Sequence, residues 1–391
     1  MNAEQLSPSI LRLSRRDFLR RSAAGCCLLG LGGLAGWSFP ARGEDKPSPA
    51  AKGLIRPRRS PWFRELEGGS LRCLLCPKEC ELKPGDRGSC RVRVNRSGAG
   101  YTLAYGNPAL VREGPVEQTP FYHFLPGSRT LAISTAGCPL ACKFCETWAM
   151  ALTEPEEIYN YDLPPARALE RARAAGVASL SYAFGEPAAF YEYMADLAEQ
   201  AKAAGLSNLV QTSGYLQFRP LKELASLLDG ANVDLKGFDP AFYREYVGGE
   251  LKPVLDSILL LREQGVHLEI TNILIPPLND NPEMIGKMCR WIKKELGPDV
   301  PLHFSRFYPL YRLSNLPPTS VPALDRARKT ALEAGLRYVY VSRVAGHPGE
   351  DTVCPACGEI VIKRMGFFVD EFRLEKGRCP KCATSVPGRW S

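Results

Sequence analysis

The sequence predicts an α/β fold in which about six repeated β-α units form a parallel sheet, with a small cysteine-rich module on each side of it. Two observations carry this prediction. Short apolar, β-branched runs alternate with amphipathic segments such as 189–204 and 253–264. In addition, 11 of the 14 cysteines fall into three tight groups. The strand-like runs are residues 130–138, 178–183, 208–212, 232–235, 267–275 and 302–307.

The length and charge of the chain limit the classes of protein to consider. At 391 residues the chain can bury a large core without covalent cross-links, so stability does not account for the 14 cysteines. The formal net charge is +8, but residues 1–60 contain 11 Lys or Arg and 4 Asp or Glu. The rest of the chain is nearly neutral, which argues against a nucleic acid partner.

The N-terminal segment has the features of an export signal. Arg15 and Arg16 precede an uncharged stretch, residues 22–39, that is rich in Leu, Ala and Gly. This arrangement resembles a twin-arginine (Tat) signal, which implies that residues 1–45 engage the Tat translocase. The expected location is the periplasm or the membrane, or the cytoplasm if the leader is not used. The alternative interpretation of residues 22–39 is a single membrane anchor rather than a signal. Residues 46–65 are predicted to be a proline-rich linker without a core.

The central cysteine group has the spacing of an iron site with an open position. Cys138, Cys142 and Cys145 follow the first predicted strand in a Cys-x3-Cys-x2-Cys loop. Three thiolates are one fewer than a closed four-iron cluster uses, so one iron would be free to bind an external chelator. Taken by itself, the loop is also compatible with a chance grouping or a zinc site.

With Phe144 before its third cysteine, this loop resembles the cluster motif of the radical S-adenosylmethionine (SAM) superfamily. The resemblance implies that residues 119–350 form a partial (β/α)6 TIM-like barrel, whose ligands lie at the C-terminal ends of the strands. It also implies a [4Fe-4S] cluster that receives an electron from a reductant such as flavodoxin or ferredoxin. The expected reaction cleaves SAM to methionine and a 5′-deoxyadenosyl radical, which abstracts hydrogen from a substrate.

Polar residues at the ends of the later strands match the SAM contacts of that superfamily. Glu186 lies in a Gly-Glu-Pro segment, and Asp234 with Lys236 resembles the Asp-Leu-Lys of glycyl-radical activating enzymes. Each residue has a structural alternative. Glu186 could be a helix cap, the Asp-Lys pair an ion pair, and His303 a core histidine. The resemblance assigns SAM binding to Phe144, Gly185, Glu186, Ser213, Asp234, Lys236 and His303.

Two further cysteine groups predict small metal-binding modules. Residues 66–118 contain four cysteines, which make a closed site for zinc or for an auxiliary iron-sulfur cluster. This N-terminal group is Cys73, Cys76, Cys80 and Cys90. Residues 351–391 contain two Cys-x2-Cys pairs, the pattern of a zinc ribbon, which predicts a structural zinc ion. This C-terminal group is Cys354, Cys357, Cys379 and Cys382.

The order of these parts resembles one family in particular, the radical SAM enzymes of the AmmeMemoRadiSam system, which are related to pyruvate formate-lyase activating enzymes. Matching passages include residues 76–91, 121–127 and 233–236. Residues 146–148 are Glu-Thr-Trp where that family has Gln-Asn-Trp. The resemblance leaves the substrate open, whether a protein or a small molecule. The alternative function is that of a non-catalytic iron-sulfur and zinc protein, such as an exported electron carrier. Such a protein would need neither a SAM-binding carboxylate like Glu186 nor a barrel.

Overall fold

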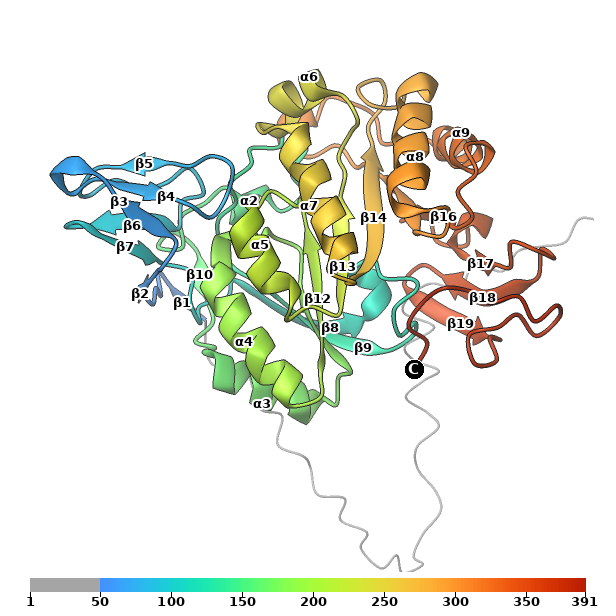
Figure 1. Cartoon of the computed structure of the whole chain (residues 1–391), viewed down its shortest axis with the longest axis horizontal. Helices are drawn as coiled ribbons and strands as arrows, with labels where there is room; N and C mark the ends of the chain where they lie inside the picture. Colours follow the sequence, from blue (N-terminus) through green and yellow to red (C-terminus); the bar gives the residue numbers. More distant parts are fainter. Residues whose placement is uncertain (1–49) are drawn as a thin grey trace, which may run out of the picture. The chain divides into compact units, whose positions relative to one another are not determined.

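Residues 50–391 are described by the computed structural model, and they contain a central sheet of eight strands with helices packed along it (Figure 1). Four smaller sheets of two or three strands complete the β-structure of these residues. The predicted leader, residues 1–45, lies outside the described residues, so the Tat signal stays a prediction. Within residues 50–391, no helix is both long enough and apolar enough to cross a membrane.

The central sheet is parallel except at one edge. Its strand order is β16-β15-β14-β13-β12-β11-β9-β8, in which only β8 runs antiparallel to its neighbour. Because β8 and β16 form the two edges, the sheet is open. The prediction of a mostly parallel α/β sheet is confirmed, although β8 and β16 were not among the predicted strands. The strands are β8 (Leu110–Pro115), β9 (Arg129–Ser134), β11 (Ser179–Tyr182), β12 (Ser207–Thr212), β13 (Gly230–Asp234), β14 (His267–Leu274), β15 (Leu302–Arg306) and β16 (Val339–Ser342).

Helix α8 (Pro282–Leu296) illustrates how the sequence determines where a helix between these strands begins and which of its faces is buried. Asn281 caps its first turn, with its side-chain oxygen accepting from the backbone N–H of Glu283 at 2.8 Å. Its buried side chains recur at helical spacing and form one apolar face; they are Ile285, Met288, Cys289, Ile292 and Leu296.

The other long helices are α3 (Pro165–Ala175), α4 (Tyr191–Ala203), α5 (Phe218–Ala225), α7 (Leu251–Glu263) and α9 (Val321–Glu333). Shorter helical turns are η1 (Glu67–Gly69), η2 (Val116–Gln118), α2 (Trp148–Ala151), η3 (Pro187–Phe190), α6 (Pro240–Phe242), η4 (Tyr243–Val247), η5 (Tyr311–Leu313) and η6 (Pro348–Glu350).

The N-terminal module consists of two three-stranded sheets, and it includes part of the segment that was predicted to be a linker. Pro57 and Pro61 lie between short strands rather than within them, so they remove no ladder hydrogen bond. Trp62 is buried, with its ring centroid 5.4 Å from that of Tyr191. The part of this segment around Ser60 and Trp62 therefore packs against the rest of the chain instead of forming a linker. The strands outside the central sheet here are β1 (Ala51–Lys52), β2 (Arg58–Arg59), β3 (Phe63–Glu65), β4 (Leu71–Cys73), β5 (Glu81–Leu82), β6 (Arg93–Arg96), β7 (Ala99–Thr102) and β10 (Tyr159–Asn160).

A buried ion pair fastens this module to helix α4. Arg93 Nη2 donates to Glu192 Oε2 at 2.7 Å, and Arg93 Nη1 donates to Ser60 Oγ at 2.8 Å. Both charged side chains are buried. Because a buried charge without its partner costs several kcal/mol, the pair ties the position of the module to that of α4.

The C-terminal module contains β17 (Thr352–Val353), β18 (Ile360–Met365) and β19 (Phe368–Phe372), and it contacts both strand β16 and residues 121–125. His123 Nδ1 lies 2.6 Å from the Pro387 carbonyl oxygen, and the Arg389 N–H donates to the His123 carbonyl at 2.8 Å. Arg364 Nη2 donates to the Tyr122 carbonyl at 2.8 Å. Residues 121–125 thus form a joint between the sheet and the C-terminal module.

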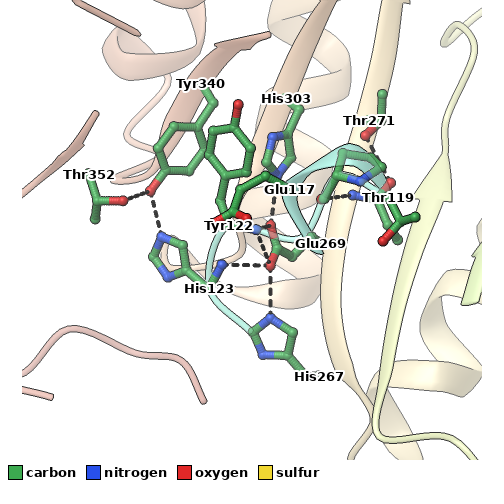
Figure 2. A network of polar contacts seen from close by, with 12 residues as sticks. Glu117, Thr119, Tyr122, His123, His267, Glu269, Thr271, His303, Tyr340 and Thr352 are labelled. Carbon is green, nitrogen blue, oxygen red and sulfur yellow. Dashed lines mark hydrogen bonds and ion pairs between the residues drawn. The ribbon is translucent and has the colours of Figure 1, made fainter. Parts of the chain in front are cut away.

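Glu269 on β14 holds the same joint from the side of the sheet, as Figure 2 shows. Its buried carboxylate accepts from the backbone N–H of Tyr122 at 3.0 Å and of His123 at 2.8 Å. The ring nitrogens Nε2 of His303 and His267 lie 2.7 and 3.1 Å from its oxygens. Burial alone would raise the pKa of Glu269, but the hydrogen bonds from His267 and His303 outweigh it and hold the pKa well below its usual range. We call these five residues the Glu269 cluster.

Candidate functional site

The Cys-x3-Cys-x2-Cys loop follows strand β9 and is fixed by backbone contacts. The Ala141 N–H donates to the Val247 carbonyl at 3.0 Å, and the Lys143 N–H donates to the Tyr246 carbonyl at 2.8 Å. Gly137, with φ of 98°, precedes the first cysteine, and a Cβ there would lie 2.6 Å from the Cys90 carbonyl oxygen. The position therefore requires glycine for both conformation and space.

The three cysteines of this loop line a cavity of about 170 Å³ at the C-terminal ends of the parallel strands. Most of the residues predicted to bind SAM line the same cavity. From the predicted set, the structure brings together Cys138, Cys142, Phe144, Cys145, Gly185, Glu186, Ser213, Asp234 and Lys236. These residues come from the ends of three strands, β11, β12 and β13, and from the cysteine loop after β9, so the fold gathers them although up to about a hundred residues separate them in sequence.

Glu186 has a fixed and buried carboxylate. Thr212 Oγ1 donates to its Oε1 at 2.7 Å, and the Ser213 N–H donates to its Oε2 at 2.8 Å. The Ala188 N–H also donates to Oε1, so Glu186 caps the short helix η3 as well as lining the cavity. Gly185 leaves room for Ser134, whose Oγ would lie 2.1 Å from any Cβ added at Gly185. The structural and the ligand-binding interpretations of Glu186 are thus compatible.

Asp234 and Lys236, which also line the cavity, form an ion pair in which one carboxylate oxygen of Asp234 has no hydrogen-bond partner. Lys236 Nζ lies 3.2 Å from Asp234 Oδ2, whereas Asp234 Oδ1 is buried without a protein partner. The hydroxyl of Ser213 is buried without a partner too. Burial alone would lower the pKa of Lys236, but the charges of Asp234, Cys142 and Tyr243, together with the hydrogen bond to Asp234, outweigh it and raise that pKa, so the lysine stays charged. Buried polar atoms without partners are uncommon in proteins, and those of Asp234 and Ser213 suit a polar ligand.

The cysteine thiols are in surroundings that disfavour the free thiolate. Burial, and then the charge of Glu186, raise the pKa of Cys138 well above its usual value. Burial raises the pKa of Cys142 to about 12, although the charge of Lys236 opposes this. Because metal ligation requires thiolates, the iron of a cluster would supply the positive charge that deprotonates them. The donor set fits a three-thiolate iron-sulfur cluster.

His303 is the one predicted SAM-binding residue that does not line the cavity. It belongs to the Glu269 cluster, is fully buried, and stacks on Tyr340 with ring centroids 5.1 Å apart (Figure 2). It pairs in the sheet with Thr271, two residues before Ile273, which does line the cavity. The structure therefore places His303 as a core histidine bonded to a carboxylate.

Several residues of the cavity lie outside the set to which SAM binding was assigned, although residues 146 and 147 belong to the segment that departs from the family pattern. Glu146 and Thr147 directly follow the last cysteine of the loop, and Glu146 forms an ion pair with Arg343. Phe184 and Gln211 lie at the ends of β11 and β12, where the Phe184 N–H donates to Gln211 Oε1 at 3.4 Å. Their positions at strand ends were the signal that could have identified them.

The four C-terminal cysteines converge as the zinc-ribbon pattern predicts. Their sulfur atoms all lie within 4.8 Å of one another. The sulfurs of Cys354 and Cys382 are 3.6 Å apart, as are those of Cys357 and Cys379. Four sulfurs at about 2.3 Å from one zinc ion in a tetrahedron would be about 3.8 Å apart. The group can hold a single metal ion.

Comparisons with known proteins agree with this geometry. Residues 132–292 match the family model of the radical SAM superfamily. Uncharacterized protein MJ0808 of Methanocaldococcus jannaschii is 35% identical over 331 residues, which cover 84% of this chain and 98% of that protein. The pyruvate formate-lyase-activating enzyme of Listeria monocytogenes is 24% identical over 177 residues, covering 43% of this chain and 71% of that enzyme. The 7-carboxy-7-deazaguanine synthase of Thermococcus kodakarensis is 27% identical over 169 residues, 39% of this chain and 64% of that enzyme.

A solved structure shows a partial likeness. The crystal structure of a domain of a pyruvate-formate lyase-activating enzyme from Bacteroides vulgatus covers 42% of this chain and 99% of that domain. The sequence identity is 16% and the TM-score is 0.38.

Proposed function

The chain belongs to the radical SAM superfamily of enzymes, and from this premise we propose that it cleaves SAM reductively with a [4Fe-4S] cluster held by Cys138, Cys142 and Cys145. The observation that carries the proposal is the cavity in which these three cysteines meet Glu186 and the Asp234–Lys236 pair. A non-catalytic electron carrier would need only the cysteines, so this polar lining favours an enzyme that binds SAM.

When bound, the cluster and SAM supply a 5′-deoxyadenosyl radical, formed together with methionine when one electron breaks the sulfonium C–S bond. The residues of this chain hold and orient the ligand. Glu186, whose oxygens are fixed by three donors, would accept from the amino group of SAM. The free oxygens of Ser213 and Asp234 would bind its other polar groups, and Lys236 offsets the charge of Asp234.

The substrate of the radical is proposed to be a protein. The support is similarity to activating enzymes of pyruvate formate-lyase and of (2S)-3-sulfopropanediol dehydratase, because those names state that the substrate is another enzyme. The similarity covers 43% of this chain. The rest of the chain has no counterpart in that alignment, so the similarity supports the radical chemistry more strongly than the choice of substrate.

The proposal is tested by incubating the anaerobically reconstituted full chain with SAM and a strong one-electron reductant. We expect 5′-deoxyadenosine and methionine to accumulate in equal amounts, as measured by liquid chromatography with mass spectrometry. Omission of the reductant is the control and should give neither product. A protein that carries the cluster but yields no 5′-deoxyadenosine would contradict the proposal and favour an electron carrier.

We further propose that the C-terminal cysteine group binds zinc and that the ion holds residues 351–391 folded. A module of about 40 residues has little core of its own, and structural zinc contributes about 10–16 kcal/mol in zinc-finger peptides. Replacing Cys354 and Cys357 with serine is expected to unfold the module and leave the central sheet folded.

Hydrogen exchange followed by mass spectrometry checks this expectation. Peptides from β18 and β19 should lose protection in the double variant, while peptides from β11 to β13 keep it. Unchanged protection of β18 would show that the joint at residues 121–125, and not the metal, maintains the module.

A further inference from the structure

Arginines and aromatic side chains lie beside the cavity of the cysteine loop. Arg306 is the last residue of β15, and Arg343 directly follows β16, at the edge of the sheet where the cavity lies. Glu146, which lines the cavity, forms an ion pair with Arg343. The Arg312 N–H donates to the carbonyl oxygen of Lys143 in the cysteine loop at 3.0 Å. We call the following residues the basic rim: Arg306, Tyr308, Tyr311, Arg312, Arg343 and, at the start of α2, Trp148.

Each arginine of the basic rim lies over a tyrosine ring. The guanidinium carbons of Arg343 and Arg306 lie 4.7 and 5.4 Å from the ring centre of Tyr308. The guanidinium carbon of Arg312 lies 5.3 Å from the ring centre of Tyr311. Because a cation–π contact does not consume the N–H donors of a guanidinium group, the rings orient the arginines and leave donors available for an acceptor.

The basic rim carries more positive charge than its neighbours neutralise. Among residues 50–391, Glu146 is the only acidic side chain that forms an ion pair with one of its three arginines. Arg306 Nε donates to the neutral carbonyl oxygen of Thr319 at 2.9 Å, and Arg312 is exposed. A single exposed arginine is ordinary, but three beside one cavity suit a ligand with carboxylates, which can accept two hydrogen bonds from one guanidinium group.

Two residues of the basic rim have a backbone conformation that is uncommon for residues with side chains. The angle φ is 53° at Tyr311 and 67° at Arg343. Tyr308 supports the second of these, because its hydroxyl donates to the Arg343 carbonyl oxygen at 3.3 Å. Since the left-handed conformation costs free energy, it gathers at ligand sites, where the surrounding structure maintains it. This supports a binding role for the rim independently of its charge.

The aromatic part of the basic rim is open to solvent. Trp148 stacks on Tyr311 with ring centroids 5.5 Å apart, yet it is 43% exposed. Leu310, which precedes Tyr311, is 41% exposed. Arginine, tryptophan and tyrosine are the residues that most often dominate binding at protein interfaces, whereas a small ligand is usually enclosed. The rim therefore suits a peptide with acidic and apolar side chains better than it suits a small anion.

We propose that the basic rim binds an acidic segment of the protein substrate and holds that protein at the cavity where the radical would form. The inference rests on the proposed function for the substrate being a protein, but peptide binding does not itself require that SAM is cleaved. The N-terminal group of cysteines lines a separate space and shares no residue with the rim, so the proposal concerns the cavity of the cysteine loop alone.

The test measures peptide binding to the full, anaerobically reconstituted chain with SAM and without a reductant. The probes are a fluorescein-labelled peptide of glycine, leucine and glutamate, and a matched peptide with glutamine in place of every glutamate. Fluorescence anisotropy should show that the acidic peptide binds at least about tenfold more tightly, and that high salt weakens its binding. Equal affinity for the two peptides, or no binding of either, would overturn the proposal. Binding of inorganic phosphate in calorimetry, without a preference between the peptides, would assign the rim to a small anion and overturn it as well.

A charge reversal locates the binding site. Arg312→Glu changes an exposed side chain and should weaken binding of the acidic peptide by at least about tenfold, while Arg312→Lys, which keeps the charge, should retain most of the affinity. The matched control is Arg64→Glu, which makes the same change of net charge at an exposed position on β3, outside the rim. It should leave the affinity unchanged. Equal losses in the two charge-reversal variants, or no loss in either, would overturn the proposal.

The outcome can be told apart from the outcome for the proposed function. A chain that binds the acidic peptide through Arg312 but never yields 5′-deoxyadenosine contradicts the proposed function and supports the peptide site. A chain that yields 5′-deoxyadenosine but does not distinguish the two peptides supports the proposed function and overturns the peptide site.

Discussion

Replacing Cys142 with alanine is expected to abolish the formation of 5′-deoxyadenosine from SAM while leaving the chain folded. Cys142 is buried at the wall of the cavity proposed to bind SAM, and the change removes one of the three thiolates that line it and would hold the proposed cluster. The lost sulfur leaves little empty space, so the packing cost is small compared with the loss of a metal ligand. The measurement is 5′-deoxyadenosine per chain after reduction, together with the iron content.

The control for this prediction separates the loss of a ligand from the loss of a cysteine. Cys289→Ala removes a buried thiol in helix α8, away from the cavity, and should keep full product formation. If Cys142→Ala still released 5′-deoxyadenosine at the wild-type rate, this loop would not be the site of SAM cleavage.

Replacing Glu269 with alanine is expected to destabilise the protein by about 3–5 kcal/mol, the usual cost of removing one partner from a buried charged network. The change leaves the N–H groups of Tyr122 and His123 and the ring of His303 buried without their acceptor (Figure 2). Because the same N–H groups belong to the joint at residues 121–125, we expect the packing of the C-terminal module against the sheet to be weakened as well. Urea unfolding at pH 7, followed by circular dichroism, measures the change.

The pH dependence gives a second check on Glu269. Its pKa in the folded state lies well below the ordinary value of 4.5, so its stabilising effect is complete above that value and is lost as the pH falls through the lowered pKa. The difference between wild type and Glu269→Ala should thus persist at pH 5 and be lost only in stronger acid, as the pH falls through the lowered pKa of the carboxyl. Glu333→Ala, at a largely exposed glutamate of α9, is the control and should cost less than about 0.5 kcal/mol. A similarly small loss for Glu269→Ala would contradict the role given to the cluster.

The parts of the site that the sequence predicted are those fixed by local motifs. The cysteine loop, Glu186 and the Asp234–Lys236 pair each follow a strand directly, so the alternation of strands and helices is enough to bring them to one edge of the sheet. His303 also lies on a strand, but its environment depends on Glu269, 34 residues away. Whether an imidazole faces a ligand or a buried carboxylate is decided by packing that no short pattern records.

The two strands that were missed have different physical causes. β16 is a short apolar Val-Tyr-Val-Ser run whose β-branched signal is present but spans only four residues. β8 is an edge strand with Arg112, Glu113 and Gly114 in its middle, and its half-exposed side chains show no alternation. Similarly, the spacing of four cysteines along the chain does not distinguish zinc from a cluster, because thiolate ligands suit both.

The joint at residues 121–125 has a consequence for how the chain is made. His123 is bonded to the carbonyl of Pro387, 264 residues further along the chain, and its own carbonyl accepts from the N–H of Arg389. On the ribosome the N-terminal parts of a chain emerge and begin to fold first. These two partners of His123 are made long after it, so the joint cannot close until the C-terminal module has been synthesised.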